Sequence, residues 1–575
     1  MSKDGIDGAR SSERGDVCDR ELSRSDEVHV IPRNNLWLSI PGLLIVTFLG
    51  SLDNTIVSTA LPTISQDLQS SSQSAYSAVG IIYLLTCTVI IPVTGKFTDI
   101  FGMKPMLYSG IALFVLSSGL CGAARNMTQL IAFRGMQGLG RGMMRVSTQI
   151  IISNIITLQD RGLINSVIGT VHSLSNALGP LIGGAIVENI PWSWCFWINL
   201  PSSAVAVVLI FYVNVNQPIH ASFGDKFKTF DFLGLVLIVG GSIAVLLGFS
   251  FASALSWKHA ATISLLAVGW VTLIAFGFWQ VKAERIGLSP IVPPRLFKSI
   301  TPTAILIGCA THSMAFYIIG FYMPLYFQWA KLDSALIAGL HVLPFAAGSS
   351  LFSIVYGYLL SKYKRYRPIL WPCWVIYLLG NALIINLDAN SSMAKQVLYL
   401  LVIALGNGGL FSTPLTALQA CMTLKQTNTS TSSFTFVRDL AGTMGISLGG
   451  LIIHSQAVRR LSHIDGAERF IDLSQVEALR DADVSDSLRA AVQQAYSKAI
   501  ATTFIFTSCV IAVGFISSLF IKKYTLDVKN VKEDDAEKEE DCKTKDVDSP
   551  ALTLIATPSD TASTYSKDMD KKRFV

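Results

Sequence analysis

Long apolar stretches recur along almost the whole chain, and they decide what it can fold into. Fourteen of them are long enough to cross a bilayer as helices, since about 20 apolar residues span its hydrocarbon core. We place them near residues 36–62, 78–97, 105–124, 128–152, 163–187, 194–215, 231–252, 259–282, 303–328, 335–360, 368–387, 396–422, 430–453 and 500–521. Only 15% of the residues are charged, against about 25% in soluble domains. The sequence therefore predicts an all-helical protein whose partner is the lipid bilayer.

Charges in the short connections predict the orientation. With a cytoplasmic N-terminus, the inner connections and the start of the C-terminal tail hold sixteen lysines and arginines, and the outer connections hold four. This asymmetry follows the positive-inside rule and places both tails in the cytoplasm. The net charge of +6 needs no nucleic-acid partner, and the nine cysteines show neither a disulfide framework nor metal-ligand spacing. We expect no metal and no cofactor.

Three arginines lie inside the fourth apolar segment, at positions 134, 141 and 145. Their spacing brings all three within about 20° of one helix face. An arginine near the bilayer centre costs at least about 2.5 kcal/mol, so such side chains normally face a protein interior or a watery cavity. We expect a cationic face, which would favour a substrate that is anionic when translocated. The alternative is that Arg141 and Arg145 pair with carboxylates of neighbouring helices or reach the headgroups.

A carboxylate in the first segment, Asp53, lies at a depth similar to that of Arg134. We expect the two to pair. The opposing effects of burial and of a nearby guanidinium can let a carboxylate exchange a proton near neutral pH, as a proton-coupled carrier requires. The alternative is a structural hydrogen-bond acceptor in a helix-breaking polar patch near Pro62.

Four residues in the connection between the second and third segments fit a tight cytoplasmic turn. They are Gly95, Asp99, Gly102 and Lys104. The stretch resembles the G-x-L-x-D-x-x-G-R-K loop of the major facilitator superfamily, with Phe97 and Met103 departing from the pattern. In that family the loop serves conformational change.

Further motifs extend the resemblance. Arg134, Gln137, Gly138 and Gly140 match an R-x-x-Q-G-x-G pattern that the family links to proton transfer. In the fifth segment, a run resembles the G-P-x-x-G-G motif of proton antiporters. Its members are Gly179, Pro180, Gly183 and Gly184. Residues 192–201 resemble a signature of fourteen-span drug:proton antiporters, except that Ser193 replaces an arginine.

Polar residues in the spans are the candidates for a substrate cavity. They are Arg141, Arg145, Gln137, Tyr326, Gln328 and Asn407. We expect Arg438 and Asp439 to pair with other charges at the cytoplasmic end. Among the glycosylation sequons, Asn390 is the plausible acceptor.

The resemblance implies a major facilitator fold with two six-helix bundles, residues 36–215 and 303–521. The second bundle would include an outer loop over 454–499. Residues 216–302 would form a linker with two additional spans, and tails 1–35 and 522–575 would be disordered in the cytoplasm.

As function, the resemblance implies a monomeric, non-enzymatic pump at the plasma membrane that exchanges small organic molecules, such as toxins or drugs, for protons. A vacuolar transporter of basic amino acids and a non-transporting membrane sensor remain as alternatives.

Overall fold

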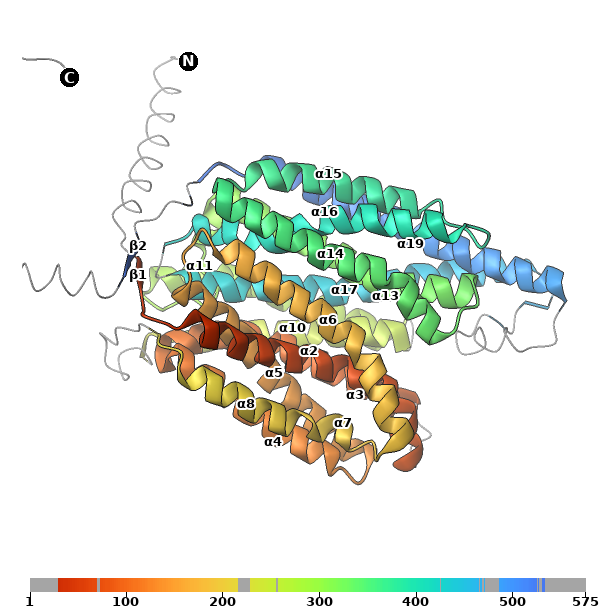
Figure 1. The fold of residues 1–575 in the computed structure, drawn as a ribbon, viewed down its shortest axis with the longest axis horizontal. Coiled ribbons are helices and arrows are strands. Elements are labelled where there is room, and N and C mark those ends of the chain that lie inside the picture. The colour runs from red at the N-terminus through yellow and green to blue at the C-terminus, as the bar shows by residue number, and fades with distance from the viewer. Residues whose placement is uncertain are drawn as a thin grey trace, which may run out of the picture.

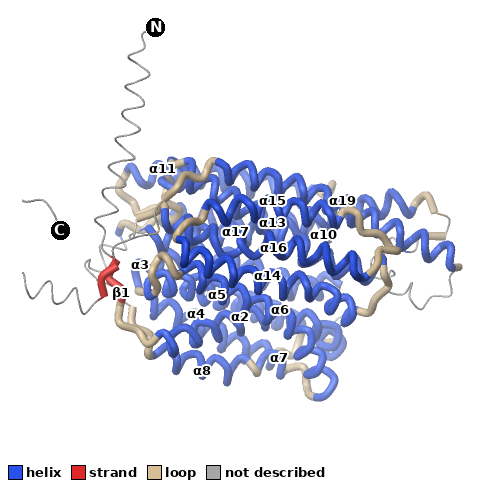
Figure 2. The backbone as a smooth tube through the Cα atoms, turned by 45° about the horizontal axis from the view of Figure 1, so that its top comes forward, coloured by secondary structure: helices blue, strands red, loops and turns tan. Residues whose placement is uncertain are grey.

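The computed structural model describes residues 29–69, 73–215, 228–254, 257–423, 426–464, 466–467, 470, 485–524, 526 and 530–532. Most of the two tails predicted from sequence therefore lies outside the described residues. Long helices run side by side along one axis (Figure 1) and account for nearly all the regular structure described (Figure 2). In chain order the elements of the N-terminal part are β1 (His29–Ile31), α2 (Leu36–Asp67), α3 (Gln73–Phe101), α4 (Met103–Gly122), α5 (Met127–Ile155), α6 (Arg161–Asn189), α7 (Trp194–Trp197) and α8 (Asn199–Phe211). The remaining elements are α10 (Phe232–Ala254), α11 (Ala260–Arg285), α12 (Arg295–Lys298), α13 (Ile300–Ala330), α14 (Ala335–Tyr363), α15 (Arg367–Ile384), α16 (Met393–Ala420), α17 (Thr427–Leu461), α19 (Asp486–Leu519) and β2 (Asn530–Lys532).

Each of the fourteen predicted apolar segments lies largely on one of these helices, with α7 and α8 sharing the sixth. Twelve helices in the described part are long and apolar enough to cross a membrane. The helices α5 and α6 are not among the twelve although each has 29 residues. Polar side chains and glycines lower their apolar content. The chain is thus a multi-pass membrane protein with twelve clear candidate spans.

The structure rules out one alternative interpretation of a helix end and corrects one expected helix start. Helix α2 continues through Pro62 to Asp67, so no helix-breaking patch interrupts it there. Residues 486–499 are expected in the outer loop but form the beginning of α19, which starts at Asp486 because the Ser485 side chain caps it by accepting from the Leu488 N–H. With 34 residues, α19 is about 51 Å long, some 20 Å more than the hydrocarbon core. Its first turns therefore project beyond the bundle (Figure 1).

The prediction of an exclusively helical chain also needs one correction. The strands β1 and β2 pair in parallel, with Val30 opposite Val531, so the two tails meet at one end of the molecule (Figure 2). Sequence periodicity could not reveal this pairing because each strand has only three residues.

The long helices form two groups, with α2–α8 on one side and α13–α19 on the other (Figure 1). The pair α10 and α11 lies beside the seam. Leu246 of α10 clusters with Leu85 and Val89 of α3, and Leu440 of α17 packs against the same cluster. The additional pair therefore covers the junction between the two groups, which we call the N-half (α2–α8) and the C-half (α13–α19).

Polar contacts join the two halves at the end where the tails meet. Asn428 Nδ2 donates to Asp99 Oδ1 at 2.9 Å, and Ser361 Oγ donates to Asp160 Oδ1 at 2.5 Å. Gln419 takes part twice, accepting from Arg161 Nη1 at 3.1 Å and donating to a serine of α5. In this conformation the halves are held together at the end predicted to be cytoplasmic.

Candidate functional site

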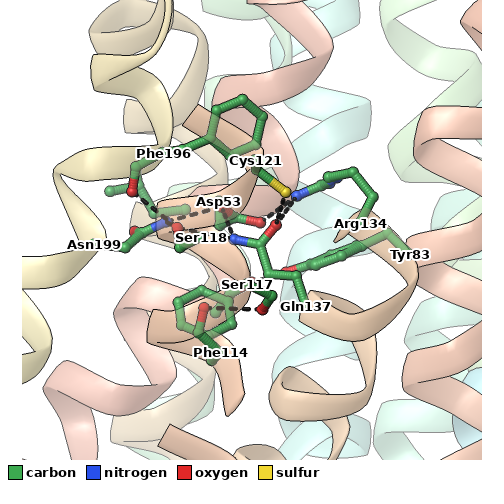
Figure 3. A network of polar contacts seen from close by, with 12 residues as sticks. Asp53, Tyr83, Phe114, Ser117, Ser118, Cys121, Arg134, Gln137, Phe196 and Asn199 are labelled. Carbon is green, nitrogen blue, oxygen red and sulfur yellow. Dashed lines mark hydrogen bonds and ion pairs between the residues drawn. The ribbon is translucent and has the colours of Figure 1, made fainter. Parts of the chain in front are cut away.

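A network of polar side chains is buried inside the N-half (Figure 3). Asp53 Oδ2 accepts a hydrogen bond from Arg134 Nη1 at 2.6 Å, and neither side chain is more than 1% exposed. The other carboxylate oxygen, Oδ1, accepts from Gln137 Nε2 and Asn199 Nδ2, both at 2.9 Å. The predicted ion pair between α2 and α5 is therefore confirmed, and both carboxylate oxygens have donors.

A second layer of contacts fixes this network. Ser118 Oγ accepts from the amides of Gln137 and Asn199 at 3.1 and 2.9 Å, and donates to the Phe196 carbonyl at 2.8 Å. The Arg134 guanidinium lies 3.9 Å from the centre of the Tyr83 ring. A buried ion pair is tolerated only when its remaining hydrogen-bonding groups are largely satisfied. Six helices, α2, α3, α4, α5, α7 and α8, supply these groups.

Sequence reasoning identified only part of this network. Asn199 belongs to the 192–201 signature, but its contact with Asp53 could not be assigned to it. Ser118 and Tyr83 belong to no motif. A polar residue among apolar neighbours was the only signal, and it recurs at many positions of the chain.

A cavity lies between the two halves. It offers about 830 Å³ of space that protein atoms do not fill, part of it open to solvent. Helices α2, α5, α6, α16 and α17 line it. Its charged, aromatic and titratable lining residues are Arg141, Arg145, His172, Phe411, Phe434 and Arg438. The cationic face of α5 predicted from sequence thus borders a cavity, and an arginine of the C-half stands beside it.

The three cavity arginines differ in their partners. Arg145 Nη1 forms an ion pair with Asp439 Oδ2 at 2.5 Å, and this pair joins the halves. Arg438 lies 3.9 Å from the centre of the Phe411 ring. Arg141 is only 7% exposed, and its Nη1 has no hydrogen-bond partner among the described residues.

The cavity and the buried pair are separated by one aromatic ring. Tyr83 lies between Arg134, at 3.9 Å from the ring centre, and Arg141, at 5.3 Å. Its hydroxyl donates to the carbonyl of Gly50, a residue that lines the cavity, at 3.2 Å. A change of charge at Asp53 would therefore change the electrostatic potential at the cavity wall.

Several predicted cavity residues lie elsewhere. Gln137 belongs to the Asp53 network, Asn407 Oδ1 contacts His312 Nε2 at 2.8 Å, and Tyr326 donates to the Asp388 carbonyl at 2.7 Å. Gln328 is not part of the cavity lining either. The depth of a polar residue follows from sequence, but the direction it faces does not when a helix is polar on several sides.

The expectation for Arg438 and Asp439 is confirmed in that Asp439 pairs with another charge, but it is wrong about where the two residues lie. Neither residue lies at the cytoplasmic end of α17. Arg438 is eleven residues beyond the first residue of that helix and lines the cavity, and Asp439 pairs with Arg145. Opposite charges can pair across the two halves, which sequence spacing does not show.

The residues of the predicted turn connect α3, α4 and the C-half. Asp99 accepts from Asn428 and Thr429 at the start of α17. Gly102 has a φ of 103°, which favours glycine, and it separates α3 from α4. Lys104 Nζ donates to the Phe211 carbonyl at 3.2 Å.

The glycines of α6 face α2 just beyond Asp53. A Cβ on Gly179 would overlap Thr55, and one on Gly183 would lie 2.8 Å from the Ile56 carbonyl oxygen. Gly184 has open space around it, and Pro180 is exposed within the helix. Two of the three motif glycines thus allow close packing of α6 on α2.

Comparisons with known proteins agree with one another. The family model described as Major Facilitator Superfamily matches residues 43–446. An uncharacterized MFS-type transporter of Schizosaccharomyces pombe is 34% identical over 503 residues, which cover 87% of this chain and 82% of the relative. The efflux pump dotC of Dothistroma septosporum is 32% identical over 426 residues, covering 74% and 72%. The crystal structure of the human organic anion transporter MFSD10 (TETRAN) has a similar fold, with a TM-score of 0.55 at 13% identity, over 83% of this chain and 100% of that chain.

Proposed function

This chain belongs to the major facilitator superfamily and is a multi-pass membrane transporter, and from that premise we propose that it is a proton-coupled antiporter that exports small organic molecules. Relatives named efflux pumps support the direction of transport. The observation that carries the proposal is the Asp53–Arg134 pair, because it is fully buried yet only one ring away from the cavity.

We propose fourteen spans, with α5 and α6 added to the twelve clear candidates. Each has 29 residues, or about 44 Å of helix, which is enough to cross the hydrocarbon core. The connection between them carries Asp160, which contacts Ser361 at the tail end of the molecule. Arg134 and Arg141 are buried in protein, so neither would face lipid. Residues 36–215 and 303–521 would then form the two six-helix bundles.

In the proposed coupling, Asp53 takes up and releases the proton. Protonation removes the charge that neutralises Arg134, whose other contacts include Gln137 Oε1 at 2.8 Å and the rings of Tyr83 and Phe196. The guanidinium would then shift, and Arg141, two turns further along α5, would move with it. Close packing at Gly179 and Gly183 would transmit movement of α2 to α6.

The test is efflux by the purified protein in liposomes with an imposed pH gradient. We expect Asp53→Asn to abolish gradient-driven transport while the protein still reaches the membrane. Asp67→Asn is the matched control, because Asp67 lies at the exposed end of the same helix and its contact with Trp192 needs only an acceptor oxygen. Full gradient-driven transport by Asp53→Asn would reject the coupling.

We propose the plasma membrane as the site of action, which imaging of a fluorescent fusion can test against the vacuolar membrane. The cations of the cavity oppose a basic amino acid as cargo. A single chain contains both halves, so we propose a monomer, to be checked by light scattering in detergent.

A further inference from the structure

We infer that the cavity binds its substrate as an organic anion, held by Arg141 from the N-half and Arg438 from the C-half. The inference rests on the proposed export function in taking this cavity as the transport site, and it deepens that function by naming the substrate class.

The balance of charge in the cavity supports an anion. Three arginines line the wall, and the carboxylate that pairs there, Asp439, is bound to Arg145. Among the described residues, Arg141 and Arg438 have no carboxylate within ion-pair distance. Leaving a charge unpaired in a poorly solvated site is costly, and an anionic ligand would supply the missing counter-charge.

The position of Arg141 makes it a binding group rather than a residue that reaches the membrane surface. Its side chain is 7% exposed, and a Cβ built on Gly50 would lie 3.3 Å from its Cγ, so the stem is packed against α2. Its Nη1 is buried without a hydrogen-bond partner in the described part of the chain. A guanidinium held in this way has a donor available for a carboxylate oxygen.

Arg438 is held in place on the opposite wall. Its guanidinium stacks on Phe411 at 3.9 Å, and Phe411 is itself wedged beside Gly169, where an added Cβ would lie 2.5 Å from the ring. The two free guanidiniums therefore come from rigid positions in different halves. An anion between them would bridge the halves.

The rest of the wall mixes polar side chains with apolar ones that can contact the body of an organic molecule. It includes Phe411, Phe434, Met144, Ile168 and Leu415. Small-molecule sites typically combine apolar side chains with a few polar groups that fix the orientation of the ligand. The combination favours an aromatic or alicyclic carboxylate or phenolate over an inorganic anion.

The test compares three probes that share one aromatic body and differ in the charge of the head group: naphthoate, naphthamide and naphthylmethylammonium. Binding to the purified full-length protein is measured by isothermal titration calorimetry at neutral pH without any gradient. We expect naphthoate to bind about tenfold or more tighter than the other two, because a hydrogen bond to a charged group contributes about 1.5–3 kcal/mol.

Variants assign the preference to the two arginines. Arg141→Gln and Arg438→Gln should each lose most of the preference for naphthoate, and Arg141→Lys should keep part of it. The control is Arg295→Gln, an exposed arginine outside the cavity that pairs with Glu284. Thermal unfolding identifies variants that fail to fold, and Arg141→Lys keeps the test decisive if Arg141→Gln is one of them.

Failure of this inference can be told from failure of the proposed function. Absent naphthoate binding, equal binding of the three probes, or an undiminished preference in both glutamine variants would overturn the anion site. Selective naphthoate binding combined with gradient-driven transport that survives Asp53→Asn would leave the anion site standing and reject the coupling. Gradient-driven export of cations alone would reject the anion site and leave the proton coupling standing.

Discussion

The packing of α6 on α2 predicts different effects for the same substitution at two adjacent glycines. A Cβ on Gly183 would lie 2.8 Å from the Ile56 carbonyl oxygen, closer than ordinary van der Waals contact, and 3.4 Å from Ile56 Cα. The backbones would have to separate by about half an ångström, and overpacking of this kind costs about 1–3 kcal/mol. A Cβ on Gly184 would meet no atom within 4 Å.

Comparing Gly183→Ala with Gly184→Ala separates the free energy of packing from that of helix propensity. Replacing glycine with alanine in a helix contributes about 1 kcal/mol of stability through propensity, and this gain is common to both positions. Gly183→Ala should therefore be about 1–3 kcal/mol less stable than Gly184→Ala. Heat and denaturant unfolding of the purified variants in one detergent would measure the difference. Equal stability would show that α6 does not pack on α2 in this way.

Three further predictions concern other contacts. A double-mutant cycle with Arg145→Ala and Asp439→Ala should give a coupling free energy of about 0.5–3 kcal/mol in unfolding experiments, and additive effects would mean that the pair does not form. Asn199→Ala should lower stability by about 1.5–3 kcal/mol by removing a donor to a charged group, whereas the exposed Asn189→Ala should change it by less than about 0.5 kcal/mol. Asn390 is exposed in the turn between α15 and α16, so we expect a glycan that Asn390→Gln removes, seen as a loss of apparent mass equal to that caused by glycosidase treatment.

Several hydrogen bonds fix the turn around Asn390. The Ser391 hydroxyl donates to Asp388 Oδ1 at 2.8 Å and lowers the pKa of that carboxyl, with help from the Asn390 N–H. Lys331 Nζ donates to the carbonyls of Ala389 and Ser391, both at 2.7 Å. Because the pKa of Asp388 is lowered on folding, its contribution to stability is present above its usual pKa and is lost as the pH falls through the lowered one. At neutral pH the ionised Asp388 therefore stabilises the turn, in which the Asn390 side chain is exposed.

The Asp53–Arg134 pair was predictable because it depends on quantities that sequence contains. Helix rise and the position of a residue within its span give its depth, and two opposite charges at one depth have strong reason to meet in hydrocarbon. The common face of Arg134, Arg141 and Arg145 follows equally from helical periodicity. These arguments need no knowledge of which helices are neighbours.

The role of Arg438 was not predictable because it depends on how the two halves meet. Its depth suits the cavity, but α17 carries polar residues on several sides, so periodicity does not tell which side faces α5. Tyr326 and Asn407 are predicted to line the cavity because each is polar and lies within a predicted span. Each instead contacts a partner within the C-half. The parallel pairing of β1 and β2 likewise joins the two ends of the chain, a separation at which three-residue patterns carry no signal.

Closure at the end predicted to be cytoplasmic and the geometry of the cavity are linked through α17. Asp99 holds the start of this helix by accepting from Asn428, and Asp439 lies eleven residues further on, about 16 Å along the axis. A rigid helix cannot leave Asp99 without also moving Arg438 and Asp439 relative to α5. Opening at this end would therefore change the distance between Arg141 and Arg438, the two groups proposed to hold the anion. A bound anion would resist that separation. The substrate would therefore have to leave before this end opens, and a fixed order of this kind is required for transport by alternating access.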